Sequence, residues 1–272
     1  MTAIPDFVAS LFSPRSTWLH FGSGDWLRLT WPRPSVFWPV PDLSRIRAVV
    51  FDLFHTLVSI EVAKPPGRAP SDILGIDREA WNRLWFSDPD DVVLGLTDFR
   101  ASFARVARSL NPEITEAQLD EALAARHVRF RHTLKEVEAE TLSGLGRLRS
   151  AGLRLGLVSN CSADEIVFWP ESPLARLLDA AVFSCEVKLK KPGPRIFRLA
   201  CDRLGVAPGQ SLFVGNGGSD ELAGARRAGM TPVLLTRHIE LMKPESIPEH
   251  AAKAEFSVRT VSELAALLTR HD

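Results

Sequence analysis

The stretch AVVFDLFHTLV, residues 48–58, places an aspartate directly after a short apolar run. A run of this length, rich in β-branched and aromatic residues, is typical of a buried strand. Asp52 therefore lies where the strand is expected to end, and its carboxylate would emerge from an apolar floor. Phe54 follows two positions later, so no second acid accompanies the first one.

Four similar apolar runs follow after residue 150, and helical patterns separate them. An alternation of strands and helices predicts a parallel sheet with helices on both faces, which is a Rossmann-like, doubly wound α/β fold. Ligands of such sheets bind beyond the carboxyl ends of the strands. The four runs are LRLGLVSN (153–160), AAVFSCEV (180–187), SLFVG (211–215) and TPVLLT (231–236).

The interval 62–140 interrupts this alternation and has helical patterns after a proline-rich opening. We predict a helical cap, inserted between the first and second core strands and lying over the site. The α/β core then comprises residues 46–61 and 141–272. The helical signals are an apolar stripe at Phe99, Phe103, Val106 and Leu110 and a capping box at Thr115 and Gln118.

Residues 1–45 have a different composition. Four of the seven tryptophans lie here among several prolines, which exclude a long helix. We predict an irregular arm whose aromatic side chains pack on the main body. Self-association or partner binding through the arm is one alternative, and a translation start further downstream is another.

The composition excludes several classes of function. The 33 basic and 33 acidic residues cancel, which argues against a nucleic-acid or anionic-membrane partner. No apolar run approaches the roughly 20 residues of a membrane span, and the signal-peptide pattern is missing. The spacing of Cys161, Cys185 and Cys201 suits neither a disulfide framework nor a zinc site, so we interpret them as buried small hydrophobic residues. We expect a cytoplasmic protein with a small-molecule substrate.

Four stretches, each at a predicted strand end or in the loop beyond it, together resemble the motifs of the haloacid dehalogenase-like (HAD) hydrolase superfamily. The resemblance covers roughly residues 46–270, and the insertion matches the helical cap of that superfamily's first cap class, C1. The stretches are FDLFHT with Asp52, LGLVSN with Ser159 and Asn160, KLKKPGPRIF with Lys191, and VGNGGSDELAGARRAGM with Asn216 and Asp220.

The resemblance implies catalytic roles for Asp52, Ser159 and Lys191. A carboxylate nucleophile such as Asp52 splits one difficult hydrolysis into two displacements through a covalent intermediate. The Ser159 hydroxyl and the Asn160 amide would bind oxygens of the attacked group. The Lys191 ammonium would offset the repulsion between an anionic nucleophile and an anionic substrate. Asn160 is thus a candidate for substrate binding, together with Phe54 and His55 in the loop after Asp52.

The resemblance also implies a Mg²⁺ ion. Mg²⁺ prefers hard oxygen ligands, which members of this superfamily supply from the nucleophile, a backbone carbonyl two residues on, and acids of the last motif. The corresponding groups here are Asp52, the carbonyl of Phe54, Asn216 and Asp220.

Two departures from the superfamily pattern bear on the reaction. Phosphatases usually carry a second aspartate where this chain has Phe54, and a positioned acid/base of that kind contributes ~10²–10⁴-fold in rate. Asn216 stands where the pattern supplies an acid, so Mg²⁺ should bind more weakly. The 2-haloacid dehalogenases carry an aromatic residue at the position of Phe54, because halide leaves without a proton. Their last motif, however, differs from GNGGSD.

We favour a Mg²⁺-dependent phosphatase of a small phosphorylated metabolite, because the last motif is closest to that branch. A 2-haloacid dehalogenase or another acid-independent hydrolase is the first alternative, and a catalytically inactive binding protein is the second. A role for His55 as a substitute acid/base is the less favoured interpretation, because adjacent residues of an extended segment point in opposite directions. Packing or hydrogen bonding in the loop is preferred over that role. Other side chains of the insertion are interpreted as a solvated helix face (Arg83, Arg126 and Arg129) and as packing (Trp81 and Trp85).

Overall fold

The computed structural model describes residues 17–21, 25–29, 43–87 and 91–269. It divides into two compact units, residues 1–41 and 42–272. In the first unit, strands β1 (Thr17–Phe21) and β2 (Asp25–Leu29) pair antiparallel.

The prediction of an irregular arm over residues 1–45 is therefore wrong for these two strands. The signal that was missed is Gly-Ser-Gly at 22–24 between two aromatic runs, a hairpin pattern that no proline interrupts. Self-association through this segment stays a prediction.

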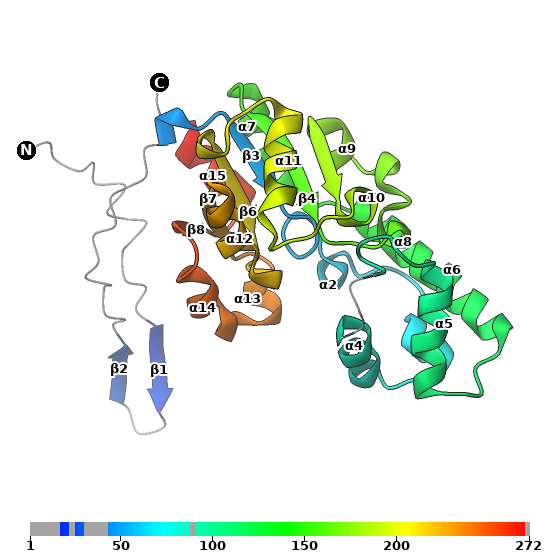
Figure 1. Ribbon diagram of the computed structural model, residues 1–272. Helices are drawn as coiled ribbons and strands as arrows, with labels where there is room; N and C mark the ends of the chain where they lie inside the picture. The colour runs from blue at the N-terminus through cyan, green and yellow to red at the C-terminus, as the bar shows by residue number, and fades with distance from the viewer. Residues whose placement is uncertain (1–16, 22–24, 30–42, 88–90, 270–272) are drawn as a thin grey trace, which may run out of the picture. The chain divides into compact units, whose positions relative to one another are not determined.

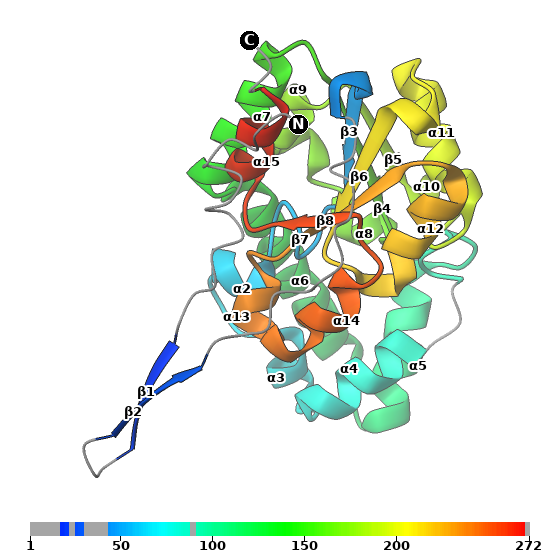
Figure 2. The same cartoon turned by 90° about the vertical axis from the view of Figure 1, so that its left-hand side faces the viewer.

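The second unit contains one parallel sheet of six strands in the order β5-β4-β3-β6-β7-β8 (Figures 1 and 2). This confirms the predicted Rossmann-like α/β fold. The three-residue strand β8 was not predicted, because so short a run carries no periodic signal. The strands are β3 (Ala48–Phe51), β4 (Arg154–Ser159), β5 (Ala180–Phe183), β6 (Ser211–Gly215), β7 (Thr231–Leu235) and β8 (Phe256–Val258).

Alternate residues of β3 enter two separate cores on opposite faces of the sheet. Val49 and Phe51 lie in the core on the face of the sheet covered by α7 and α15. Ala48 and Val50 lie in the core on the opposite face, which α11 and α12 cover. Figure 2 shows the sheet between these two helix layers. The four helices are α7 (Ala139–Ser150), α15 (Val261–Leu268), α11 (Pro194–Leu204) and α12 (Glu221–Ala228).

The described residues between β3 and β4 form helices and no strand. The insertion lies beyond the carboxyl ends of the strands (Figure 1) and has a core of its own, in which Trp81 and Trp85 stack at a centroid distance of 5.5 Å. The predicted capping box of Thr115 and Gln118 is confirmed, as is the packing role of the two tryptophans. The helices before α7 are α2 (Ile60–Ala63), α3 (Pro70–Leu74), α4 (Arg78–Ser87), α5 (Phe99–Leu110) and α6 (Glu116–Lys135).

Short helical segments connect the remaining strands, and one of them corrects the sequence reading. AAVFSCEV was predicted as strand throughout, but its second half forms helix α10 (Ser184–Val187). No helix among the described residues has the length and apolarity to cross a membrane. The other short segments are η1 (Leu43–Arg45), α8 (Ala163–Ile166), η2 (Trp169–Glu171), α9 (Leu174–Leu177), η3 (Pro208–Gln210), η4 (Gly218–Asp220), α13 (Ile239–Met242), η5 (Pro244–Ser246) and α14 (Ile247–Ala251).

Candidate active site

Asp52 is the first residue beyond β3 and is buried at the carboxyl end of the sheet. Its backbone N–H donates to the carbonyl of Val214 in β6, which continues the strand pairing to this residue. The loop then folds back, with His55 in the left-handed region at φ 61°. This turn brings the Thr56 hydroxyl to Oδ2 of Asp52, to which it donates at 2.7 Å. Thr56 was not selected from the sequence.

Lys191 is buried beside Asp52 and lies between two carboxylates. Its Nζ donates to Oδ1 of Asp52 at 2.5 Å and to Oε2 of Glu221 at 2.6 Å. Asn160 holds the backbone of Lys191 from both sides: its Oδ1 accepts from the N–H at 2.8 Å and its Nδ2 donates to the carbonyl at 2.9 Å. The Asn160 side chain therefore fixes the lysine, and its role in substrate binding stays a prediction for its backbone amide.

The acid that joins this cluster from the glycine-rich turn is Glu221 and not the predicted Asp220. Glu221 is 1% exposed, and its Oε1 accepts from the N–H of Gly217 at 3.0 Å. The Asp220 side chain is 45% exposed and pairs with Arg227 and Lys253. The i, i+4 pattern does not separate the two acids, because Gly224 and Ala225, one helical turn beyond Asp220 and Glu221, are both buried.

The charges of the cluster are coupled. Burial and the nearby charge of Asp52 raise the pKa of Glu221 to about 7. Burial acts to lower the pKa of Lys191, but the charges and hydrogen bonds of Asp52 and Glu221 outweigh it and raise that pKa above its ordinary value. Lys191 is therefore an ammonium at neutral pH and supplies a positive charge between two acids.

Ser159 offers a hydrogen-bond donor that has no partner among the described residues. It is the last residue of β4, the strand that pairs with β3, and it is 1% exposed. An unpaired buried hydroxyl is costly unless a ligand satisfies it. Ser159 thus fits the binding of an anionic oxygen at the sheet edge where Asp52 lies.

The insertion meets the loop after Asp52 at Phe54. The ring of Phe54 lies edge to face against Phe130 of α6, with centroids 5.6 Å apart. His55, the next residue, has Nδ1 3.4 Å from Oε2 of Glu61 in α2. The two candidates for substrate binding therefore have different surroundings, one aromatic and one acidic.

Arg126 forms a second charged group where the insertion meets the core. Its Nε lies 2.6 Å from Oδ2 of Asp164, and its second guanidinium arm lies 2.8 Å from Oε1 of Glu165. Its guanidinium carbon is also 4.5 Å from the centre of the Phe130 ring. The side chain is 12% exposed, so the interpretation of Arg126 as part of a solvated helix face is wrong.

The arrangement of donors does not fit the implied Mg²⁺ ion. Both carboxylate oxygens of Asp52 accept hydrogen bonds, from Lys191 and Thr56, and the Phe54 carbonyl accepts one from Asn216. The described residues include no group of three or more His, Cys, Asp or Glu that could hold a metal ion. Asp220 points elsewhere, and a donor, the Nδ2 of Asn216, faces the Phe54 carbonyl where the ion would bind.

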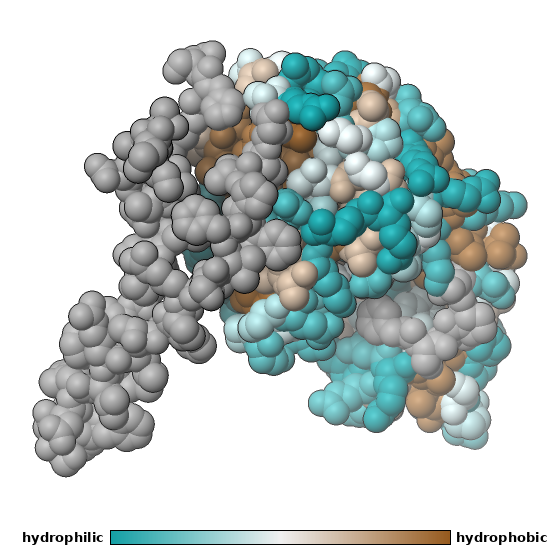
Figure 3. Space-filling model, turned by 60° about the vertical axis from the view of Figure 1, so that its left-hand side comes forward, coloured by the Kyte–Doolittle hydropathy of each residue, from teal (hydrophilic) through white to brown (hydrophobic). Residues whose placement is uncertain are grey.

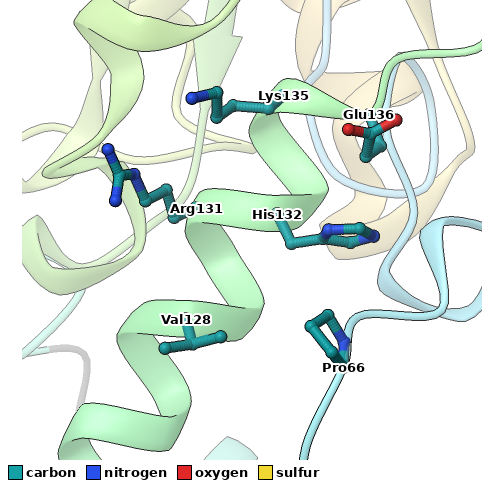
Figure 4. A pocket seen from close by; sticks show the side chains of 6 residues that line it. All are labelled: Pro66, Val128, Arg131, His132, Lys135 and Glu136. Atoms are coloured by element: carbon teal, nitrogen blue, oxygen red, sulfur yellow. The ribbon is translucent and has the colours of Figure 1, made fainter.

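Two shallow hollows of the described surface lie away from this cluster. One lies between α6 and the loop at Pro66 (Figure 4). Its cations Arg131 and Lys135 both contact Glu171, and they point to the side of α6 opposite His132. The other is lined by Ala223, Arg226, Arg227 and Lys253. On the face seen in Figure 3, hydrophilic side chains cover broad areas between smaller apolar ones. Neither hollow contains a candidate catalytic residue.

Comparison with known proteins agrees with the motifs. The family described as haloacid dehalogenase-like hydrolase matches residues 46–229. The chain is 30% identical to (S)-2-haloacid dehalogenase 4A of Burkholderia cepacia, over 84% of this chain and 97% of that protein. It is also 30% identical to phosphoglycolate phosphatase of Salmonella typhimurium, over 71% of this chain and 82% of that protein. The solved HAD phosphatase of Thermococcus onnurineus is similar with a TM-score of 0.57 and 26% identity, covering 82% of this chain and 98% of that one.

Proposed function

Because the chain belongs to the haloacid dehalogenase-like hydrolase family, we propose that it hydrolyses a small 2-substituted acid by displacement at carbon, with Asp52 as the nucleophile. Its relatives include dehalogenases and phosphatases at the same identity, so they do not separate the two reactions. The observation that carries the proposal is the Phe54 ring packed against Phe130, where an acid would otherwise protonate the leaving group.

The first step forms an ester. A carboxylate oxygen of Asp52 attacks the carbon beside the substrate carboxylate, and the leaving group, such as halide, departs with the bonding electrons. Each oxygen of Asp52 has a second lone pair beyond the one that Thr56 or Lys191 engages, so the nucleophile is held without being blocked. The unpaired Ser159 hydroxyl would bind the substrate carboxylate.

The second step restores the enzyme. Water attacks the carbonyl carbon of the Asp52 ester, the 2-hydroxy acid leaves with its oxygen protonated, and the remaining proton passes to solvent. Lys191 stabilises the carboxylate as it forms again, because its ammonium lies 2.5 Å from Oδ1.

A phosphatase is the second candidate. The turn GNGGSD and the phosphatase relatives favour it, and Asp52, Ser159 and Lys191 would serve a phosphate ester equally well. For Mg²⁺ to assist, however, it would have to displace the Asn216 amide nitrogen that faces the Phe54 carbonyl. Without an acid at Phe54, such an enzyme would be restricted to esters with good leaving groups.

The test measures chloride released from (S)-2-chloropropionate and phosphate released from 4-nitrophenyl phosphate, each with Mg²⁺ and with a chelator. We expect chloride release in the chelator, its loss in Asp52→Asn and its retention in Asp220→Asn, a matched change at an exposed acid. Phosphate release that requires Mg²⁺ and Asp52 would establish the second candidate instead. Silence with both substrates would contradict both and favour a binding protein.

A further inference from the structure

The Asn216 side chain joins two backbone groups from distant parts of the chain. Its Oδ1 accepts a hydrogen bond from the N–H of Gly218 at 2.7 Å, and its Nδ2 donates one to the carbonyl of Phe54 at 3.0 Å. Phe54 belongs to the loop of the nucleophile, whereas Asn216 follows β6. The amide therefore fastens the nucleophile loop to the glycine-rich turn.

The chemistry of the two partners fixes the orientation of this amide. A backbone N–H only donates and a carbonyl oxygen only accepts. Turning the Asn216 amide over would set its nitrogen against the Gly218 N–H and its oxygen against the Phe54 oxygen. The nitrogen thus faces Phe54, at a place where a hard cation would need an oxygen ligand.

We propose that Asn216 is a positioning residue that takes the place of a metal ion, because its amide holds the Phe54 carbonyl and closes the cation position beside Asp52. The local charge needs no further cation, since the Lys191 ammonium already lies between Asp52 and Glu221. An incoming divalent cation would meet that ammonium and an amide N–H instead of free oxygens.

The substitution Asn216→Asp should reopen the position. The new carboxylate can still accept from Gly218, but it has no hydrogen to donate to the Phe54 carbonyl. Oxygens would then face one another two residues from Asp52, an arrangement that a divalent cation stabilises. We expect the apparent Mg²⁺ affinity to increase by at least about tenfold over that of the unchanged protein.

The insertion provides a matched control in Asn111. Its Oδ1 accepts from the N–H two residues further on, Glu113, and its Nδ2 donates to the carbonyl of Leu74. This is the same pair of bonds that Asn216 makes, in a part of the chain without the nucleophile. Asn111→Asp therefore adds the same charge and breaks the same bond, and it should leave Mg²⁺ affinity unchanged.

The experiment titrates Mg²⁺ into the unchanged chain, Asn216→Asp and Asn111→Asp by calorimetry, and follows their melting temperatures with and without Mg²⁺. It uses no substrate, so its outcome does not depend on whether chloride release is seen. Asn216→Ala, which frees the Phe54 carbonyl without adding a carboxylate, should melt earlier than the unchanged chain and gain no Mg²⁺ response.

Saturable binding by Asn216→Asp alone is the expected result. If that variant is unfolded without Mg²⁺, refolding on addition of Mg²⁺ supports the same conclusion. Binding by the unchanged chain as tight as by Asn216→Asp overturns the proposal, as does equal binding by Asn111→Asp or no response in any variant.

Discussion

Two regions of the molecule use the same arrangement, one cation between two carboxylates, in different surroundings. The sheet-edge group consists of Lys191 between Asp52 and Glu221, all of them buried. The insertion group consists of Arg126 between Asp164 and Glu165, where Glu165 keeps 20% of its side chain exposed. A buried charge should serve the chemistry in the sheet-edge group and packing in the insertion group.

The two cations differ in how much else supports them. Among the described residues, Lys191 is the one cation paired with Asp52 and Glu221. The pKa of Glu221 rises to about 7 beside Asp52. The planar Arg126 also lies over the Phe130 ring, and His127 gives Asp164 a second partner at 2.6 Å. Loss of the cation should therefore have a larger effect at the sheet edge.

The largest effect is expected for Lys191→Met. The change leaves Asp52 and Glu221 buried with no cation between them, and removing one partner of a buried pair costs about 3–5 kcal/mol of stability. We also expect kcat/KM to fall by roughly 10²–10³-fold, since Asp52, the proposed nucleophile, loses its charged hydrogen-bond donor. Urea unfolding and chloride release measure the two effects, with Lys190→Met as the neighbouring control. Near-normal activity would show that the ammonium is dispensable.

Glu221→Gln tests the sheet-edge group through the pH dependence of its unfolding free energy. The folded chain holds a proton on Glu221 up to about pH 7, whereas the unfolded chain releases it near the ordinary value of 4.5. The raised pKa therefore stabilises the folded state at low pH, and this contribution is lost as pH rises from 4.5 through 7. The slope is at most about 1.4 kcal/mol per pH unit, which sums to roughly 3 kcal/mol.

Unfolding free energies of the unchanged chain and Glu221→Gln, measured in urea between pH 5 and 8, check this prediction. Their difference should decrease from pH 5 to about 7 and then level off, because glutamine does not titrate and Glu221 is ionised in both states at higher pH. Parallel curves would mean that Glu221 titrates alike in the folded and unfolded chains.

The sequence predicted what depends on local pattern. Five of the six core strands follow from apolar runs, and Asp52 and Ser159 lie at one sheet edge because each follows or ends a parallel strand. The choice between Asp220 and Glu221 depends on a left-handed turn at Ser219 and Asp220, with φ of 53° and 50°, which residue identity does not specify. The prediction therefore missed the acid by one position.

Contacts between segments far apart in the sequence could not be predicted from the sequence either. Arg126 and Asp164 are 38 positions apart, and the helical pattern around Arg126 gave no sign that a core acid would cover it. The bond between Asn216 and Phe54 spans 162 positions, and its direction follows only when both backbone partners are known. Residue types thus predicted which side chains lie near one another, whereas the pairing of individual atoms depends on the fold.

An intermediate effect is expected for Arg126→Met. Asp164 keeps His127 as a partner, so we expect a loss of about 1–3 kcal/mol, smaller than for Lys191→Met. Because Arg126 joins helix α6 of the insertion to the core acids Asp164 and Glu165 and does not contact the reacting atoms, KM should increase several-fold while kcat changes little. Arg126→Lys keeps the charge but loses the two-armed geometry and the stacking. Its stability should therefore lie between that of the unchanged chain and that of Arg126→Met. Urea unfolding and initial rates measure both; a fall in kcat as large as for Lys191→Met would contradict the separation of roles.

The smallest effect is expected where the same arrangement is exposed. Arg100 lies 3.0 Å from Oε2 of Glu116 and 2.5 Å from Oδ1 of Asp120, and its side chain is 45% exposed. Water and salt already screen these charges, so holding them together gains little over leaving them solvated. Arg100→Met should therefore leave the melting temperature unchanged within error at physiological salt, and chloride release unchanged as well. A decrease equal to that of Arg126→Met would mean that the arrangement itself, and not its burial, sets the effect.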